Sequence, residues 1–234
     1  MVHHAVHLRR GMWRSNTRIR FLAGAPGRSG SAGGALRPSR EGAAVCIPSD
    51  TSKFQWSNPQ SGQYASVVQF PSPVGTLPLP RSWVFVDASF NGKAFRFIGT
   101  HLESVVPSIR QAQGGELRAG PADTSLPVIL AMDSNAQAMP LPRDPTYLDF
   151  IAAGYNDAWT EIFPLVPGFT CCQAQFDNNP ASQLYQRIDL ILTRGNIEAQ
   201  NIALFGVDPA TKTPGGLWPS DHAGVAAQLV VEQE

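Results

Sequence analysis

The sequence predicts a mixed α+β domain that follows a leader of different composition. Three observations predict this fold class: short apolar or alternating runs separated by Pro, Gly and Asn, an Asn-Gly pair between two of these runs, and two segments with helix-boundary signals. The 234 residues are 43% hydrophobic, which is enough for one sizeable core. We therefore expect a single folded domain over residues 51–234.

Six runs have the length and composition of strands. They cover residues 67–70, 83–88, 94–99, 127–132, 188–193 and 225–231. The tetrapeptide Phe90-Asn91-Gly92-Lys93 separates the second run from the third, and Asn-Gly between two strands is a strong hairpin signal. We expect these two runs to pair antiparallel.

Two further segments, residues 106–119 and 145–153, are predicted helices. The second has Pro145 close to its start and Gly154 just after its end, where helices favour these residues. No apolar run in the chain approaches the roughly 20 residues that span a bilayer. We therefore expect a soluble protein without a transmembrane segment.

Residues 1–50 differ from the rest of the chain in charge. They hold eight Arg against Glu41 and Asp50, and they are rich in Gly, Ala, Ser and Pro, a composition typical of disorder. The remaining residues hold 10 basic and 16 acidic side chains, a formal net charge of −6. Such a body is a poor general surface for long nucleic acids, whose binding depends on Lys and Arg. We expect a disordered leader, with a transit peptide, a wrongly opened reading frame and a basic nucleic-acid-binding arm as alternatives.

Cysteine usage and the N-terminal charges leave the compartment open. Three cysteines supply neither an even disulfide framework nor a four-ligand zinc set. We interpret the adjacent Cys171 and Cys172 as small buried apolar side chains rather than as a redox pair. Arg14, Arg18 and Arg20 interrupt the apolar core that a signal peptide needs, so no secretion signal is predicted.

Four polar clusters carry the residue types that phosphate-ester hydrolysis needs: a base for water, contacts for phosphate oxygens, and usually a metal ligand. They are Gly99-Thr100-His101-Leu102-Glu103, Met132-Asp133-Ser134-Asn135-Ala136, Arg187-Ile188-Asp189-Leu190-Ile191 and Trp218-Pro219-Ser220-Asp221-His222. Asp133 and Asn135 are two residues apart at the end of a predicted strand, so their side chains leave on the same side. By the same alternation, Arg187 and Asp189 share a face, where a carboxylate can hold an imidazole.

In this order and spacing, the clusters resemble the endonuclease/exonuclease/phosphatase superfamily of metal-dependent phosphoesterases. Its members include deoxyribonucleases, abasic-site endonucleases, sphingomyelinases and inositol polyphosphate phosphatases. The resemblance covers residues 50–231, and the segment 168–173 also looks like one that is common in microbial members. It implies a four-layer α/β/β/α sandwich, in which two antiparallel sheets pack face to face and place the strand-end motifs at one edge.

The resemblance also implies a reaction: hydrolysis of a phosphodiester or phosphomonoester with Mg²⁺ or Mn²⁺. The substrate would be a small molecule, a lipid headgroup or a nucleic acid. The resemblance implies that His222 is the general base and that Asp189 orients it. It implies that His101 contacts the scissile phosphate and that Asp133 and Asn135 position the nucleophile and the phosphate. Asp221 would bind the metal.

The chain departs from the family pattern in two places. Met132-Asp133-Ser134-Asn135 stands where most members have Gly-Asp-Phe-Asn. Before Thr51 we find no counterpart of the family's early strands, early Asn and metal-binding Glu, and Glu41 is the single Glu there. We therefore expect a sandwich that lacks part of its N-terminal half and has weak activity. The alternative function is a catalytically inactive remnant of such a domain.

Overall fold

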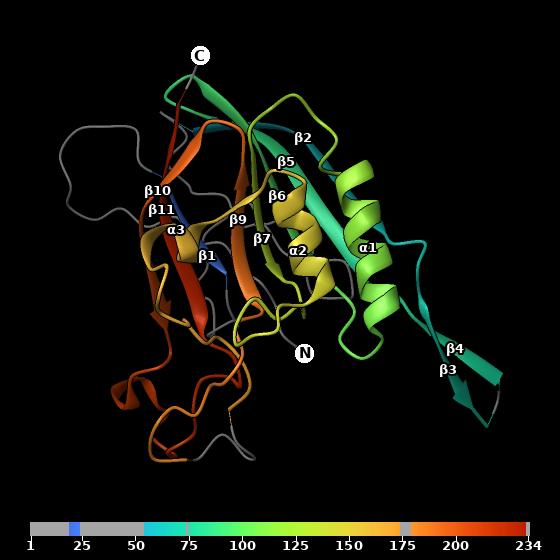
Figure 1. Ribbon diagram of the computed structural model, residues 1–234, viewed down its shortest axis with the longest axis vertical. Coiled ribbons are helices and arrows are strands. Elements are labelled where there is room, and N and C mark those ends of the chain that lie inside the picture. Colours follow the sequence, from blue (N-terminus) through green and yellow to red (C-terminus); the bar gives the residue numbers. More distant parts are fainter. Residues whose placement is uncertain (1–18, 24–53, 74, 174–178, 233–234) are drawn as a thin grey trace.

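The computed structural model describes residues 19–23, 54–73, 75–173 and 179–232. Its strands form a six-stranded sheet, a three-stranded sheet and a two-stranded hairpin that projects away from both (Figure 1). The large sheet has the order β2 (Phe54–Gln63), β5 (Ser82–Phe90), β6 (Lys93–His101), β7 (Val128–Asp133), β9 (Asp189–Arg194) and β8 (Asn156–Asp157). The small sheet has the order β1 (Ile19–Ala23), β11 (Gly224–Val231) and β10 (Ile197–Phe205). The hairpin consists of β3 (Val68–Ser72) and β4 (Gly75–Leu79).

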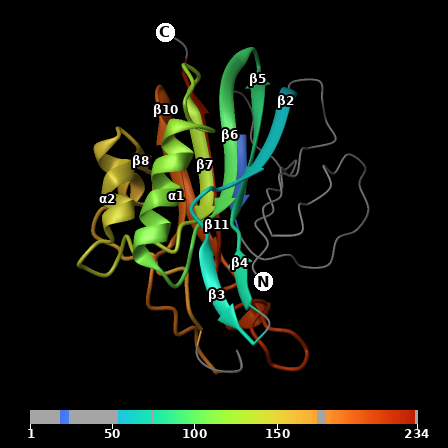
Figure 2. The same cartoon turned by 90° about the vertical axis from the view of Figure 1, so that its right-hand side faces the viewer.

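Two helices, α1 (Pro107–Ala119) and α2 (Pro145–Ala152), lie side by side along one face of the large sheet (Figure 2). Each begins at a proline, which is favoured there because an N–H at the first helical position would have no acceptor within the helix. The short helix α3 (Ala158–Ile162) packs against β9 and β10, and η2 (Pro209–Thr211) is a single 3₁₀ turn. No helix in the described part of the chain is both long enough and apolar enough to cross a membrane.

Two hydrophobic clusters hold the layers together. One lies between the two sheets and includes Phe97 of β6, Ile129 of β7 and Leu229 of β11. The other lies between the large sheet and the helices and includes Leu130 of β7 and Phe150 of α2. Because successive strand residues face opposite sides, β7 contributes to both clusters, and all of its residues are buried. The fold is therefore α+β with two packed sheets, as predicted, but the large sheet is mixed rather than antiparallel, because β6 and β7 pair in parallel.

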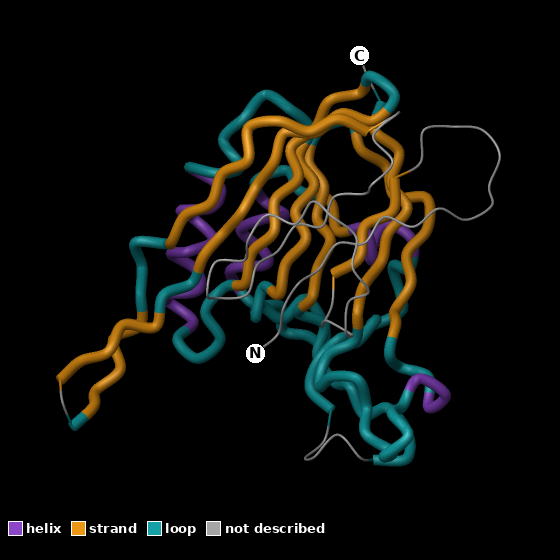
Figure 3. Tube along the Cα trace, turned by 180° about the vertical axis from the view of Figure 1, so that it is seen from behind, coloured by secondary structure: helices purple, strands orange, loops and turns teal. Residues whose placement is uncertain are grey.

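The helical layers are present on one side of this sandwich. Seen from behind, the small sheet carries no helix over its outer face in the residues that the structure describes (Figure 3). Instead, α3 packs at the junction of β9 and β10, where its Trp159 enters the cluster between the sheets. Three of the four predicted layers are thus described.

The predicted elements correspond to β3, β5, β6, β7, β9, β11, α1 and α2, each within two residues of the predicted bounds. Strands β5 and β6 pair antiparallel, with Asn91 (φ 51°) and Gly92 (φ 81°) in the turn between them. An Asn-Gly pair favours such a turn because both residues tolerate positive φ. The hairpin prediction is confirmed.

Strands β1, β2, β4, β8 and β10 were not predicted. A bulge interrupts β2 between Ser57 and Gln60, and another interrupts β10 between Ala199 and Asn201, so neither strand shows regular alternation. Strand β1 lies inside the segment predicted to be a disordered leader, and it pairs with β11. That prediction is therefore wrong for these five residues. The rest of residues 1–50 lies outside the described part of the chain.

Candidate active site

Three neighbouring strands of the large sheet each place a polar residue at the same edge. In register, His101 at the end of β6 lies opposite Asp133 at the end of β7, and Asp133 lies opposite Asp189 at the start of β9. The three residues meet at one edge because β6 and β7 are parallel and end there, whereas β9 runs antiparallel to them and begins there. Both aspartates are buried, and Nε2 of His101 lies 3.4 Å from Oδ2 of Asp133. Three predicted site residues therefore form one row.

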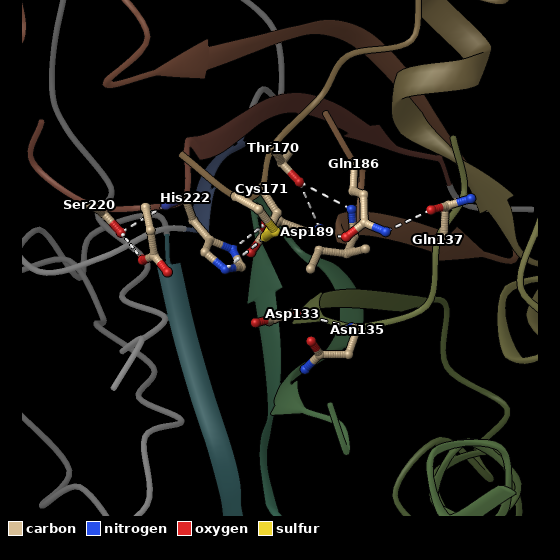
Figure 4. Close-up of a disulfide and its surroundings, with 12 residues drawn as sticks. Asp133, Asn135, Gln137, Thr170, Cys171, Gln186, Asp189, Ser220 and His222 are labelled. Atoms are coloured by element: carbon tan, nitrogen blue, oxygen red, sulfur yellow. Dashed lines mark hydrogen bonds and ion pairs between the residues drawn. A yellow bond between two sulfur atoms is a disulfide. The ribbon is translucent and has the colours of Figure 1, made fainter. Parts of the chain in front are cut away.

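His222 approaches this row from the turn that precedes β11 (Figure 4). Its Nδ1 lies 2.8 Å from Oδ2 of Asp189. A carboxylate only accepts hydrogen bonds, so Nδ1 donates and Nε2 is left to accept a proton. Burial lowers the pKa of His222, but the hydrogen bond and charge of Asp189, with the charges of Asp133 and Asp221, outweigh it and raise the pKa to about 9.

Thr170 holds the start of β9 beside this pair. Its Oγ1 accepts hydrogen bonds from the backbone N–H groups of Ile188 at 3.1 Å and Asp189 at 3.0 Å. Its carbonyl accepts from the N–H of Ala223 at 2.7 Å, next to His222. A single residue therefore ties the strand that carries the carboxylate to the segment that carries the imidazole. Composition gave no sign of this role, which depends on contacts between distant segments.

The chain turns sharply after β7 and keeps Asn135 next to Asp133. Asn135 has a φ of 48°, and its N–H donates to Oδ1 of Asp133 at 3.0 Å. Its side-chain amide donates to the carbonyl of Leu102 at 2.9 Å, which joins this turn to the end of β6. Met132 and Ser134, which depart from the family pattern, are both buried, and Ser134 donates to a backbone carbonyl just before β9 at 2.6 Å.

Arg81, immediately before β5, extends the row beyond His101 and was not predicted. Its Nη1 lies 3.1 Å from Nε2 of His101, and its Nη2 donates to Oγ of Ser104 at 3.1 Å. Its Nε lies 3.5 Å from the buried carboxylate of Glu103, while the arginine side chain is 24% exposed. The positively charged side chain of Arg81 therefore reaches solvent beside the row. Sequence gave no signal for it, because only the pairing of β5 with β6 brings Arg81 to this edge.

The residues that could hold a divalent cation differ from the predicted ligand. Asp133, Asp189 and His222 each offer one ligand atom, and these atoms lie within 4.8 Å of one another. Asp221, the predicted ligand, is exposed and accepts from Oγ of Ser220 at 3.3 Å. Two carboxylates suit Mg²⁺ or Mn²⁺, so the donor chemistry fits such an ion. Glu41 lies outside the described residues.

Cys171 and Cys172 form a disulfide, so their interpretation as unlinked apolar side chains is wrong. Cys171 is buried, whereas Cys172 is partly exposed. The backbone of Cys171 bridges both Gln186 and His222, which brings its sulfur to the edge of the site. Sequence adjacency alone did not indicate a bond, because three cysteines allow several arrangements.

Solved structures of the endonuclease/exonuclease/phosphatase family share this fold. A family protein from Bacteroides thetaiotaomicron aligns with a TM-score of 0.56 and 20% identity over 78% of this chain and 68% of its own. The mannosyl-6-phosphatase Bt3783 of the same species gives 0.54 and 19% over 77% and 68%. D. rerio TDP2, complexed with single-strand DNA product, gives 0.53 and 20% over 77% and 70%.

Models of protein families and curated protein sequences gave no match to this chain. The structural similarity is at low sequence identity and shows the fold. The chain therefore has the fold of the endonuclease/exonuclease/phosphatase family, and the resemblance seen in the sequence is confirmed at that level.

Proposed function

We propose that the chain is a metal-dependent hydrolase of phosphate esters, with His222 as general base and Asp189 as the residue that orients it. The observation that carries this proposal is the 2.8 Å contact between these two side chains beside the row of polar strand ends. The fold is also that of a phosphatase and of a protein that binds a DNA product, which makes phosphate-ester chemistry the best-supported class.

In this proposal, the Asp189 carboxylate selects the imidazole tautomer and stabilises the imidazolium that forms. With Nδ1 donating to Asp189, Nε2 of His222 takes a proton from the attacking water. Asp133 and Asn135 hold the water and the phosphate at the centre of the row. Both side chains lie on this edge, and the hydrogen bond from Asn135 fixes the Asp133 carboxylate.

At the other end of the row, His101 and Arg81 face the phosphate. Arg81 donates to a ring nitrogen of His101, and the N–H groups that remain on the two side chains are suited to donate to non-bridging oxygens, where negative charge increases during the reaction. A divalent ion held by Asp133 and Asp189, with Asp221 nearby, would supply further charge stabilisation to the same oxygens. We retain Mg²⁺ or Mn²⁺ as the proposed cofactor.

The proposed substrates are phosphodiesters or phosphomonoesters in a small molecule, a lipid headgroup or a nucleic acid. The net charge of −6 over residues 51–234 disfavours long duplex DNA. Release of p-nitrophenol from a diester and from a monoester, each with Mg²⁺ and with a chelator, tests the proposal. We expect p-nitrophenol to be released from at least one of the two substrates, and we expect the chelator to stop this release. Release from neither would favour the alternative, a catalytically inactive domain that keeps phosphate contacts.

Arg81→Ala is expected to raise KM more than it lowers kcat, because the guanidinium would bind phosphate in the ground state as well as in the transition state. A charge-assisted hydrogen bond contributes about 1.5–3 kcal/mol, so kcat/KM should fall roughly 10- to 150-fold. Steady-state kinetics measure both constants. Arg81→Lys should recover part of the loss, whereas an unchanged KM in both variants would remove Arg81 from the site.

The pKa of His222 predicts an alkaline pH profile. A general base must be neutral to act, so kcat/KM should rise with pH up to about 9 rather than levelling off near 6.5. In Asp189→Asn the rising limb of the pH profile should move to lower pH, because burial then lowers the pKa of the imidazole without the compensating carboxylate. Because the folded pKa is raised, the pair should stabilise the fold below about pH 6.5 and lose that effect as pH rises through about 9. A wild-type limb near 6.5 would contradict the pairing.

A further inference from the structure

The Cys171–Cys172 disulfide lies directly against the imidazole that the proposed reaction uses. Sγ of Cys171 is 3.3 Å from Nε2 of His222, while Nδ1 of the same ring contacts Asp189 (Figure 4). The nitrogen that would take a proton from water therefore faces a sulfur atom. Nothing in the proposed hydrolysis requires sulfur at this place.

Backbone hydrogen bonds hold the cysteine pair here independently of the sulfur atoms. The N–H of Cys171 donates to the carbonyl of Gln186 at 2.8 Å, and the N–H of Tyr185 donates to the carbonyl of Cys171 at 2.9 Å. Cys172 has a φ of 94°, which non-glycine residues rarely adopt, and its N–H donates to the carbonyl of Asp221 at 3.1 Å. Opening the disulfide breaks none of these bonds. The backbone of both cysteines would therefore stay in place, with Cys171 beside His222 and Cys172 next to it.

We propose that Cys171 and Cys172 are a reversible thiol–disulfide site whose reduced form binds a thiophilic divalent cation together with Nε2 of His222. Two thiolates and an imidazole form a soft ligand set of the kind that selects Zn²⁺ or Cd²⁺, unlike the carboxylates proposed for Mg²⁺. The two cysteines are adjacent in the chain, so after reduction their sulfur atoms can move apart and still contact one ion. Binding occupies the base nitrogen and blocks hydrolysis, a consequence that rests on the proposed function.

Reduction requires an external dithiol, and the exposure of the two cysteines sets its course. A thiolate of the dithiol attacks Sγ of Cys172, which is partly exposed, and the buried Cys171 leaves as a thiolate. The second thiol of the reductant attacks the mixed disulfide, releases Cys172 and closes the cyclic disulfide of the reductant. Two electrons pass to the protein, and cation binding then releases any proton that the two sulfur atoms still carry.

Cadmium binding tests this site without reference to hydrolysis, because thiolate-to-cadmium charge transfer gives an ultraviolet absorption that oxygen and nitrogen ligands do not give. The protein should carry Cys46→Ser, which leaves Cys171 and Cys172 as its cysteines. After reduction and removal of the dithiol, it should bind one Cd²⁺ per chain with this absorption, and the reoxidised protein should not. His222→Ala should weaken binding roughly tenfold or more, a loss seen even for residues that only support metal ligands.

Cys172→Ser, added to Cys46→Ser, is the second variant and should lose most of the absorption while circular dichroism shows an intact fold. A reduced, folded protein without the absorption would overturn the proposal, and so would a protein that unfolds on reduction or binds Cd²⁺ equally well without His222. If the absorption forms in a protein with no hydrolytic activity under any condition, the proposed function fails and the cation site stands. If metal-dependent hydrolysis is observed but the absorption does not form, the cation site fails and the proposed function stands.

Discussion

Asp189→Asn is expected to lower kcat/KM by about 10²–10⁴-fold while the protein stays folded, because this carboxylate is proposed to orient the general base. The side chain is 1% exposed and accepts the Nδ1 hydrogen of His222 at 2.8 Å. An amide in its place can donate to Nδ1 instead. That contact favours the tautomer whose Nε2 carries the hydrogen and cannot accept a proton from water.

The measurement is steady-state hydrolysis of an activated phosphate ester, with thermal unfolding of the same sample as the test of folding. Asp208→Asn is a suitable control, because Asp208 is an exposed aspartate that caps the η2 turn. It should leave kcat/KM within about twofold, since Asn can accept the same capping hydrogen bond at this exposed position. Equal turnover of Asp189→Asn and wild type would remove Asp189 from the proposed mechanism.

Asp157→Ala is expected to lower the free energy of unfolding by about 3–5 kcal/mol, because it leaves the charge of Arg187 buried without its partner. Both side chains are 2% exposed, and Nη1 of Arg187 donates to Oδ2 of Asp157. The same carboxylate accepts from Oη of Tyr147 at 2.9 Å, and its Oδ1 accepts from the N–H of Trp159 at 3.0 Å, at the start of α3. One substitution therefore removes an ion pair and a helix cap.

Urea unfolding followed by circular dichroism measures this loss. Glu198→Ala, at an exposed position of β10, is the control and should change the free energy of unfolding by less than about 0.5 kcal/mol. Because Arg187 lies two residues before Asp189, the variant should also loosen the start of β9. A free energy of unfolding within 1 kcal/mol of wild type would show that the pair is not a structural anchor.

Strands with regular alternation or a continuous apolar run were predictable from the sequence, and interrupted strands were not. All six residues of β7 are buried, and all except Asp133 are apolar. A continuous apolar run of this kind predicts a buried strand. In β2, by contrast, the bulge contains Asn58 and Pro59, which favour turns in most contexts. The pairing of β2 with β5 across this bulge depends on the neighbouring strand, which local sequence does not encode.

The polar residues of the site were predictable because they lie at or next to the ends of strands, but their neighbours were not. His101, Asp133 and Asp189 each stand at a strand end, and the sheet register places them in one row. Arg81 and the disulfide joined this row through contacts between segments far apart in the chain. The roles assigned to all six predicted site residues stay predictions, since geometry shows where side chains lie and not what they do.

The most direct test of the central claim is the hydrolysis of bis(p-nitrophenyl) phosphate by wild type and by His222→Ala, each with Mg²⁺, with Mn²⁺ and with a chelator. His222 has a side chain that is 8% exposed and is held by Asp189, so removing the ring takes away the proposed base without adding a charge. We expect slow turnover by wild type that the chelator stops, and a loss of about 10²-fold or more in His222→Ala. Turnover in His222→Ala equal to wild type, or turnover by wild type that the chelator does not affect, would contradict a metal-dependent mechanism based on the Asp189–His222 pair.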